Sequence, residues 1–151
     1  MVIEFNTDIA IVGRIIMACC VGGLIGWERE RHGSSAGIRT YGAIALGSCV
    51  FGVLSLALVG ADPSRIAAQI VTGIGFLGGG VIFRQGDYVS GLTTAATLWA
   101  TAAVGVAIAF GLYIIGILTG ILIFLLLYLP LLPWWKKVSH KLLRLNTPDA
   151  D

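Results

Sequence analysis

The sequence predicts an all-α membrane protein, built as a bundle of five transmembrane helices. Of its 151 residues, 57% are hydrophobic and only 12% are charged, whereas a soluble domain carries roughly 25% charged residues. The mean hydropathy is +0.92. The apolar residues also form runs long enough to cross the hydrocarbon core of a bilayer, which is roughly 30 Å thick. The net charge of +2 is too small to suggest nucleic acid as a partner.

Five apolar segments can be placed along the chain, over about 9–27, 40–59, 64–83, 91–110 and 112–132. Asp62 is expected to cap the third helix, because its side chain can accept a free backbone N–H group. A single helix over 92–132 would be roughly 60 Å long, twice the hydrocarbon thickness. A turn is therefore expected at Gly111, and residues 1–133 form one transmembrane domain.

Basic residues predict the orientation of the bundle, because they concentrate on the cytoplasmic side of a membrane protein. With five crossings, most basic residues fall on one side: Arg29, Arg31, Arg39, Arg84, Lys136, Lys137, Lys141 and Arg144. We therefore expect the N-terminus outside and the C-terminus in the cytoplasm. Residues 134–151 are predicted to form a short amphipathic helix on the membrane surface, either as an anchor alone or as a docking segment for a partner.

Arg14 is the least expected residue, because it lies inside the first apolar segment. An arginine at the centre of a membrane helix costs about 2.5 to 3.5 kcal/mol on insertion scales. Two interpretations remain open: a snorkelling or structurally paired arginine, or a buried charge that binds an anion or a carboxylate. Small residues follow Arg14 at four-residue steps, at Ala18, Gly22 and Gly26. This face should pack on protein, so Arg14 should point into the bundle.

The third apolar segment carries polar residues on one helical face. Arg65, Gln69 and Thr72 lie about one turn apart, and Gln69 matches Arg14 in its predicted depth. We predict one polar intramembrane site in the outer half of the bundle, formed by Arg14, Arg65, Gln69, Thr72 and Asp62. Two arginines this close would repel each other unless an anion or a carboxylate lay between them.

The same segment is rich in glycine, at Gly73, Gly75, Gly78, Gly79 and Gly80. Each glycine weakens a helix by about 0.8–1.0 kcal/mol relative to alanine. Close helix packing through Gly75 and Gly79 is one explanation. The other is a bent or locally unwound helix whose freed backbone groups line a cavity.

Two further groups of polar residues complete the candidate site. Thr94, Thr97 and Thr101 share one face of the fourth segment and are expected to meet the face of Gln69 and Thr72 in a polar interior. A charged rim is predicted on the cytoplasmic side, at Glu28, Arg29, Glu30 and Arg39. No Asp or Glu lies within an apolar segment, so we expect no metal site. Without a nucleophile–base pair or phosphate loop, neither an enzyme nor a cofactor is expected.

Three stretches resemble the signatures of the MgtC/SapB family of membrane proteins: residues 22–30 with 36–40, residues 62–78 and residues 91–99. The similar region covers about 14–128. The resemblance implies a multi-pass protein of the bacterial inner membrane, associated with growth in low magnesium and with survival inside host cells. It also implies action on other membrane machinery, notably the F-type ATP synthase. The chain is expected to be a short form, without the soluble C-terminal domain of longer relatives.

Three functions follow as alternatives. The first is a non-enzymatic regulator that binds other membrane proteins. The second is a transporter or binder of a small anionic solute, which Arg14 and Arg65 would attract. Transport of Mg²⁺ ranks third, because no acidic residue lies within the apolar segments. A homo-oligomer, most simply a dimer, is also expected, because small residues recur at Gly22 and Gly26 and again at Gly116 and Gly120.

Overall fold

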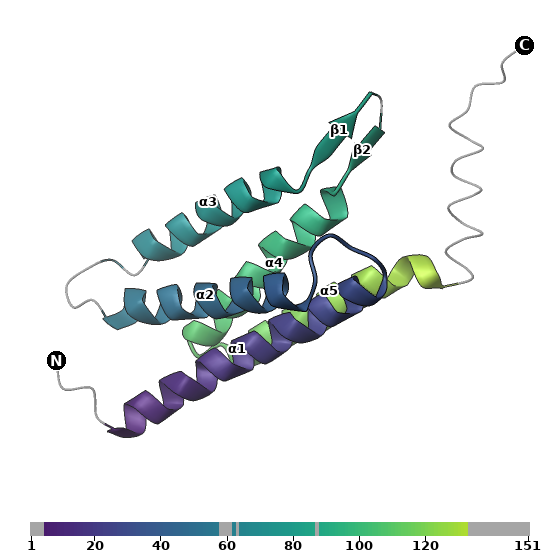
Figure 1. Cartoon of the computed structure of the whole chain (residues 1–151). Helices are drawn as coiled ribbons and strands as arrows, with labels where there is room; N and C mark the ends of the chain where they lie inside the picture. The colour runs from purple at the N-terminus through teal and green to yellow at the C-terminus, as the bar shows by residue number, and fades with distance from the viewer. Residues whose placement is uncertain (1–4, 58–61, 63, 87, 133–151) are drawn as a thin grey trace, which may run out of the picture.

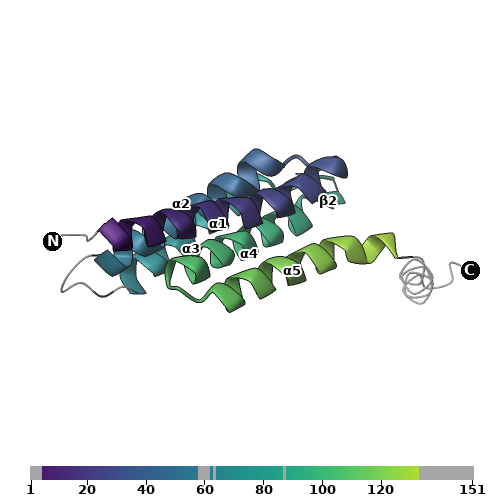
Figure 2. The ribbon, with the colours of Figure 1, turned by 90° about the horizontal axis from the view of Figure 1, so that it is seen from below.

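The computed structural model describes residues 5–57, 62, 64–86 and 88–132. Its elements are α1 (Phe5–Arg31), α2 (Ile38–Ala57), α3 (Ser64–Gly80), β1 (Phe83–Gln85), β2 (Tyr88–Ser90), α4 (Leu92–Ala109), α5 (Tyr113–Tyr128) and the 3₁₀ turn η1 (Leu129–Leu131). The helices form one elongated bundle, in which α1 begins at one end and α5 ends at the other (Figures 1 and 2). The mostly helical fold is thereby confirmed. The amphipathic helix predicted at 134–151 lies outside the described residues.

Four helical stretches are long and apolar enough to cross a bilayer: Asp8–Arg31, Ile38–Ala57, Leu92–Ala109 and Tyr113–Leu131. α3 is shorter, with 17 residues, because it ends at Gly80 and not at the expected Phe83. Its length is about 26 Å at 1.5 Å per residue, slightly less than the hydrocarbon thickness. A fifth crossing by α3 therefore stays a prediction.

The segment after α3, between the third and fourth apolar segments, is a β-hairpin. β1 and β2 pair antiparallel, with Arg84 opposite Val89. Gly86 adopts a φ of +61°, a conformation that costs glycine little and so permits the sharp reversal of the chain. The hairpin projects from the end of the bundle and joins α3 to α4 (Figure 1).

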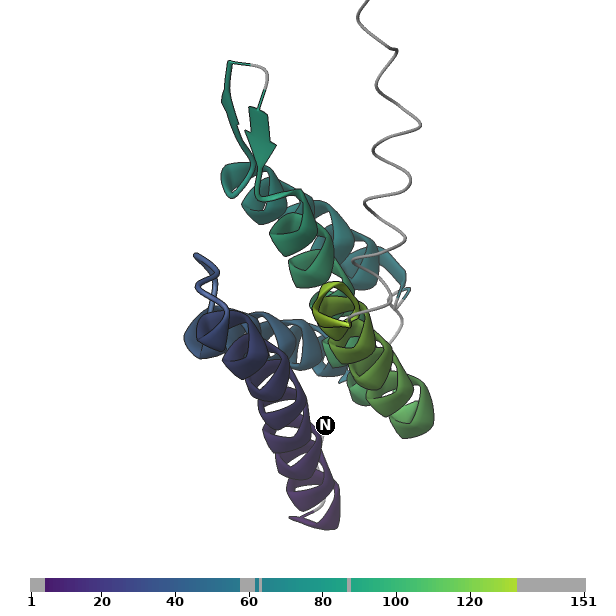
Figure 3. The same cartoon turned by 90° about the vertical axis from the view of Figure 1, so that its right-hand side faces the viewer.

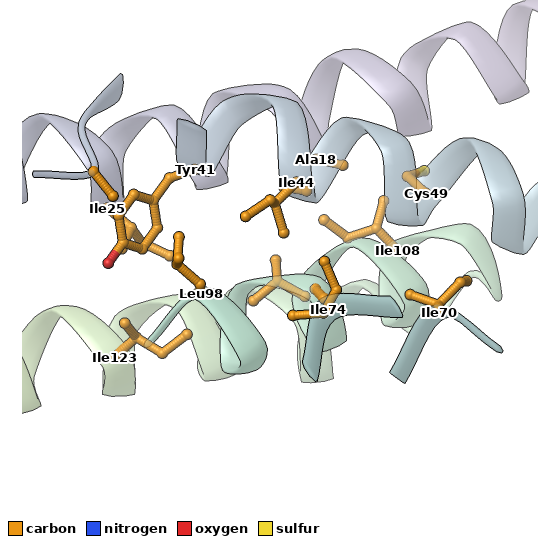
Figure 4. Close-up of a cluster of buried hydrophobic side chains, with 14 of the residues drawn as sticks. Ala18, Ile25, Tyr41, Ile44, Cys49, Ile70, Ile74, Leu98, Ile108 and Ile123 are labelled. Atoms are coloured by element: carbon orange, nitrogen blue, oxygen red, sulfur yellow. The ribbon is translucent and has the colours of Figure 1, made fainter. Parts of the chain in front are cut away.

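The hydrophobic core lies mainly between α1, α2 and α4. Ile25, Tyr41 and Leu98 are among its largest fully buried side chains, and they come from these three helices in turn (Figure 4). α3 contributes Ile70 and Ile74 to the core and packs on α2 and α4. Seen from the end of the bundle, α3 and the hairpin lie on one side and α1 on the other (Figure 3).

The glycines expected to mediate contact between two copies pack inside the chain. A Cβ atom on Gly22 would lie 2.6 Å from the Cβ of Ala45, and one on Gly120 would lie 2.7 Å from Cγ1 of Val21. A side chain at either position would require a neighbour to move, so these glycines allow the neighbouring helices to approach closely. Gly26 and Gly116 are enclosed in the same way. The face of Ala18, Gly22 and Gly26 therefore packs on protein, as expected, and the dimer stays a prediction.

Candidate functional site

A polar cavity of about 540 Å³ lies where α2 ends and α3 begins. Its polar lining consists of Ser55, Asp62, Ser64, Arg65 and Gln69. Three of the five residues predicted to form one polar site therefore do line a common cavity. Its volume is in the range of small-molecule sites, roughly 300–1,000 Å³, so the cavity can hold a ligand that bears polar groups.

Asp62 begins α3 in the way its position in the sequence predicts. Its Oδ1 atom accepts the backbone N–H of Ser64 at 2.9 Å, and its carbonyl oxygen accepts the backbone N–H of Arg65 at 3.2 Å. The hydrogen bond from the Ser64 backbone, followed by that from its hydroxyl, lowers the pKa of Asp62 below its ordinary value. The carboxylate is therefore ionised at neutral pH, so the cavity presents an anion as well as the Arg65 cation.

Arg14 does not line this cavity. Its Nε donates to the Tyr113 hydroxyl at 2.9 Å, and its Nη1 donates to the carbonyl oxygen of Ala109 at 2.8 Å. The predicted turn between α4 and α5 is present, because Gly111 has a φ of +76°. Arg14 thus joins α1 to both ends of this turn. The structure supplies it with structural partners and does not bring it together with Arg65 and Gln69 in one cavity.

The glycine-rich part of α3 is a continuous α-helix, and most of it faces away from the other helices. A Cβ added to Gly75 or Gly79 would meet no atom within 4 Å, whereas one on Gly78 would lie 3.7 Å from Ala95. Neither close packing through Gly75 and Gly79 nor an unwound helix is observed. Open space also surrounds Gly73 and Gly80. Phe76, on the same face, is 84% exposed.

The α4 threonines are buried, but they do not meet the polar face of α3. Thr97 donates to the carbonyl oxygen of Thr93 at 2.8 Å and lies 2.6 Å from the Tyr41 hydroxyl. Because its one proton is used on a carbonyl, Tyr41 donates to Thr97. Thr94 pairs with Ser34 at 3.4 Å, and Thr101 donates to the carbonyl oxygen of Thr97.

The polar residues of α3 are exposed by contrast. The Thr72 hydroxyl donates to the carbonyl oxygen of Ala68 in its own helix at 3.1 Å, and Gln69 is exposed. The predicted meeting of the two polar faces is therefore wrong. Sequence reasoning missed Tyr41 and Ser34 as the partners of the threonines. A tyrosine within an apolar segment was the available signal, because a buried hydroxyl needs a partner.

The predicted charged rim is partly buried. Glu28 is only 4% exposed, and its Oε1 atom lies 3.1 Å from Nδ1 of His32. Two buried side-chain atoms at this rim, Oε2 of Glu28 and Nε of Arg29, have no hydrogen-bond partner among the described residues. Glu30 accepts the backbone N–H of Ile38 at 3.0 Å and so ties the first loop to α1. Arg39 is exposed.

Together these features define a polytopic helical membrane protein with a polar cavity at one end. A model of the MgtC family matches residues 15–132. The chain belongs to this family, as the three stretches of similar sequence predicted.

Curated relatives are similar over much of this chain. The "Putative magnesium transporter YhiD" of Escherichia coli (strain K12) is 46% identical over 123 residues, which cover 76% of this chain and 57% of the relative. "Protein MgtC" of Brucella abortus (strain 2308) is 53% identical over 96 residues, 63% of this chain and 40% of the relative. "Protein MgtC" of Salmonella typhimurium (strain LT2) is 50% identical over 97 residues, 64% of this chain and 42% of the relative.

The similar stretches thus span about half the length of these relatives. No solved structure matches the chain.

Proposed function

We propose that this chain is a non-enzymatic regulator of other proteins in the bacterial inner membrane, active in adaptation to low magnesium. Membership of the MgtC family supports the proposal, and one relative is named for magnesium transport. The F-type ATP synthase, which the family resemblance implies as a target, is the first partner to test. Survival inside host cells would be the setting in which this regulation matters.

The observation that carries the proposal is the open face of α3, formed by Gln69, Thr72, Phe76 and Gly79. These four residues are exposed, while Ile70 and Ile74 on the opposite side pack into the core. Gln69 also lines the polar cavity, so it has polar surroundings at that end of the face. Further along the face, Phe76 is 84% exposed and a Cβ added to Gly79 would meet no atom within 4 Å, so a helix of another membrane protein could pack closely there. The open face of α3 therefore suits a membrane-protein partner, and a second copy of this chain would compete for it.

A photo-crosslinking residue at position 76 tests this surface in intact cells. We expect adducts with another membrane protein from position 76 and few from position 51 on α2. Phe51 is a matched control, because it is an exposed aromatic residue on a different helix. Phe76→Ala should also abolish growth in low magnesium and leave stability within about 0.5 kcal/mol, since the side chain is largely exposed. Adducts from neither position, together with unimpaired growth of Phe76→Ala, would refute the proposal.

The proposed arrangement in the membrane has five crossings, with the N-terminus outside and the C-terminus in the cytoplasm. The excess of basic residues on one side supports it. Cysteines introduced at Ser35 and at Ala61 test it, in a chain whose native Cys19, Cys20 and Cys49 are replaced. We expect a membrane-impermeant thiol reagent to label position 61 from outside and position 35 only after the cells are opened. The reverse labelling pattern would show that the chain has the opposite orientation. Labelling of both positions from outside would show that the segment between them does not cross the membrane.

A second candidate function is binding of a small anionic solute. The cavity that holds Arg65, Ser64 and Gln69 favours it, because a guanidinium with neighbouring polar groups can bind phosphate or carboxylate. Arg14, which first suggested such a site, has protein partners. Of the two arginines, only Arg65 therefore supports the binding of a small anionic solute.

A further inference from the structure

An apolar groove of about 430 Å³ runs between α3 and α4. Its walls include Ala67, Ala68 and Val71 of α3 and Trp99, Ala103 and Ala107 of α4. Ala68 also lines the polar cavity at the start of α3, so the cavity and the groove adjoin there. From Ser64 in the cavity to Val71 in the groove, the two sites together extend about 10 Å along the axis of α3, at 1.5 Å per residue.

The polar cavity offers one cation and one anion that do not neutralise each other. Arg65 and Asp62 both line it, yet no ion pair joins these two described residues within 4.0 Å. Asp62 accepts hydrogen bonds from the backbone and the hydroxyl of Ser64, but a carboxylate offers about four acceptor sites, so it can still accept from a further donor. A ligand that carries a phosphate and an ammonium group would therefore find a partner for each charge.

We propose that the cavity and the groove together bind a phospholipid with an amine-bearing headgroup. Arg65 holds the phosphate, Asp62 holds the ammonium group, and one acyl chain lies in the groove between α3 and α4. Each part of the lipid meets a surface of matching polarity, because the charged residues stand at the start of α3 and the apolar walls extend along it. This assignment is independent of the regulator role and competes with the small anionic solute as the ligand of the Arg65 cavity.

Native mass spectrometry of the full chain in mild detergent tests the assignment, with lipids titrated one at a time. Phosphatidylethanolamine should bind at least about tenfold more tightly than phosphatidylglycerol or phosphatidylcholine, a difference of about 1.4 kcal/mol. Arg65→Gln and Asp62→Asn should each remove this preference. Arg84→Gln is the matched control, because Arg84 is an exposed arginine on the hairpin, and it should bind the lipid like the parent chain.

The groove has its own pair of variants on α4. Ala103→Phe fills the groove and should abolish lipid binding, whereas Ala96→Phe should not, because Ala96 is exposed and lies outside the groove lining. If Ala103→Phe does not fold, the proposal is tested by Arg65→Gln alone: it stands if this variant loses the preference for phosphatidylethanolamine and fails if the preference remains. The proposal fails if soluble phosphoethanolamine binds as tightly as the lipid and Ala103→Phe has no effect, which would favour a soluble solute. It also fails if phosphatidylglycerol binds equally well and Asp62→Asn is without effect.

Discussion

Replacing Arg14 with leucine is expected to lower the free energy of unfolding by about 3 kcal/mol, because hydrogen bonds from charged groups contribute roughly 1.5–3 kcal/mol each. The substitution removes the donors to the Ala109 carbonyl oxygen and the Tyr113 hydroxyl. It also leaves that carbonyl, at the end of α4, without its side-chain partner. Leucine is more favourable in lipid, so the net loss should fall below the sum of the two bonds.

Two further variants separate the contributions of the two Arg14 hydrogen bonds, which together are called the Arg14 clamp. Tyr113→Phe removes one of the two bonds and should lower the free energy of unfolding by only about 1 kcal/mol. Arg14→Lys keeps a cation near the carbonyl but cannot reach both acceptors in the same geometry. Its loss of unfolding free energy should therefore lie between those of Tyr113→Phe and Arg14→Leu. Denaturant titration in detergent micelles measures all three. If Arg14→Leu unfolds at the same point as the parent chain, the clamp contributes nothing and Arg14 needs another explanation.

Gly22→Val should have an equally large effect, because a side chain at this position has no space. An added Cβ would lie 2.6 Å from both the Cβ of Ala45 and the carbonyl oxygen of Tyr41. One of these contacts is with backbone, so α1 and α2 must separate. Overpacking typically costs 1–3 kcal/mol, and we expect a loss of about 3 kcal/mol here.

Gly23→Val is the matched control for this substitution. Its added Cβ would meet only Cγ2 of Ile38, at 4.0 Å. Helix propensity and residue type are identical in the two variants, so the difference in unfolding free energy reports the contact between α1 and α2. Thermal unfolding in detergent is sufficient to measure it. Equal stabilities for Gly22→Val and Gly23→Val would show that the helices do not approach each other at Gly22.

The start of α3 and the turn between α4 and α5 could be predicted from the sequence because they depend on local chemistry. Asp62 caps the helix it precedes, and Gly111 supplies the left-handed φ that a turn needs. The end of α1 could not be predicted, because the helix continues through the charged residues after Trp27 to Arg31. The hairpin at 83–90 could not be predicted either. Its strands have only three residues each, too few for an alternating pattern to appear in the sequence.

The partners of each polar residue could not be predicted, because they depend on how every helix is rotated in the bundle. Counting residues along α1 and α3 placed Arg14 and Gln69 at the same depth in the membrane. Depth does not predict the direction in which each side chain points. Arg14 faces the turn between α4 and α5, while Gln69 faces the cavity beside α2. The four-residue glycine spacing carried the same ambiguity. It predicts close packing at Gly22 and at Gly75 alike, although only Gly22 has a neighbour.

The bond between Tyr41 and Thr97 has a consequence for how the protein is made. These residues are 56 positions apart, with all of α3 and the hairpin between them. During synthesis from the N-terminus, α2 reaches the membrane long before α4 exists. The Tyr41 hydroxyl must therefore keep water or another temporary partner until Thr97 arrives. α3 packs on α4 as well as on α2, so part of its packing surface has no partner until α4 has been made. Until then the nascent chain consists of an α1–α2 pair and an incompletely packed third helix.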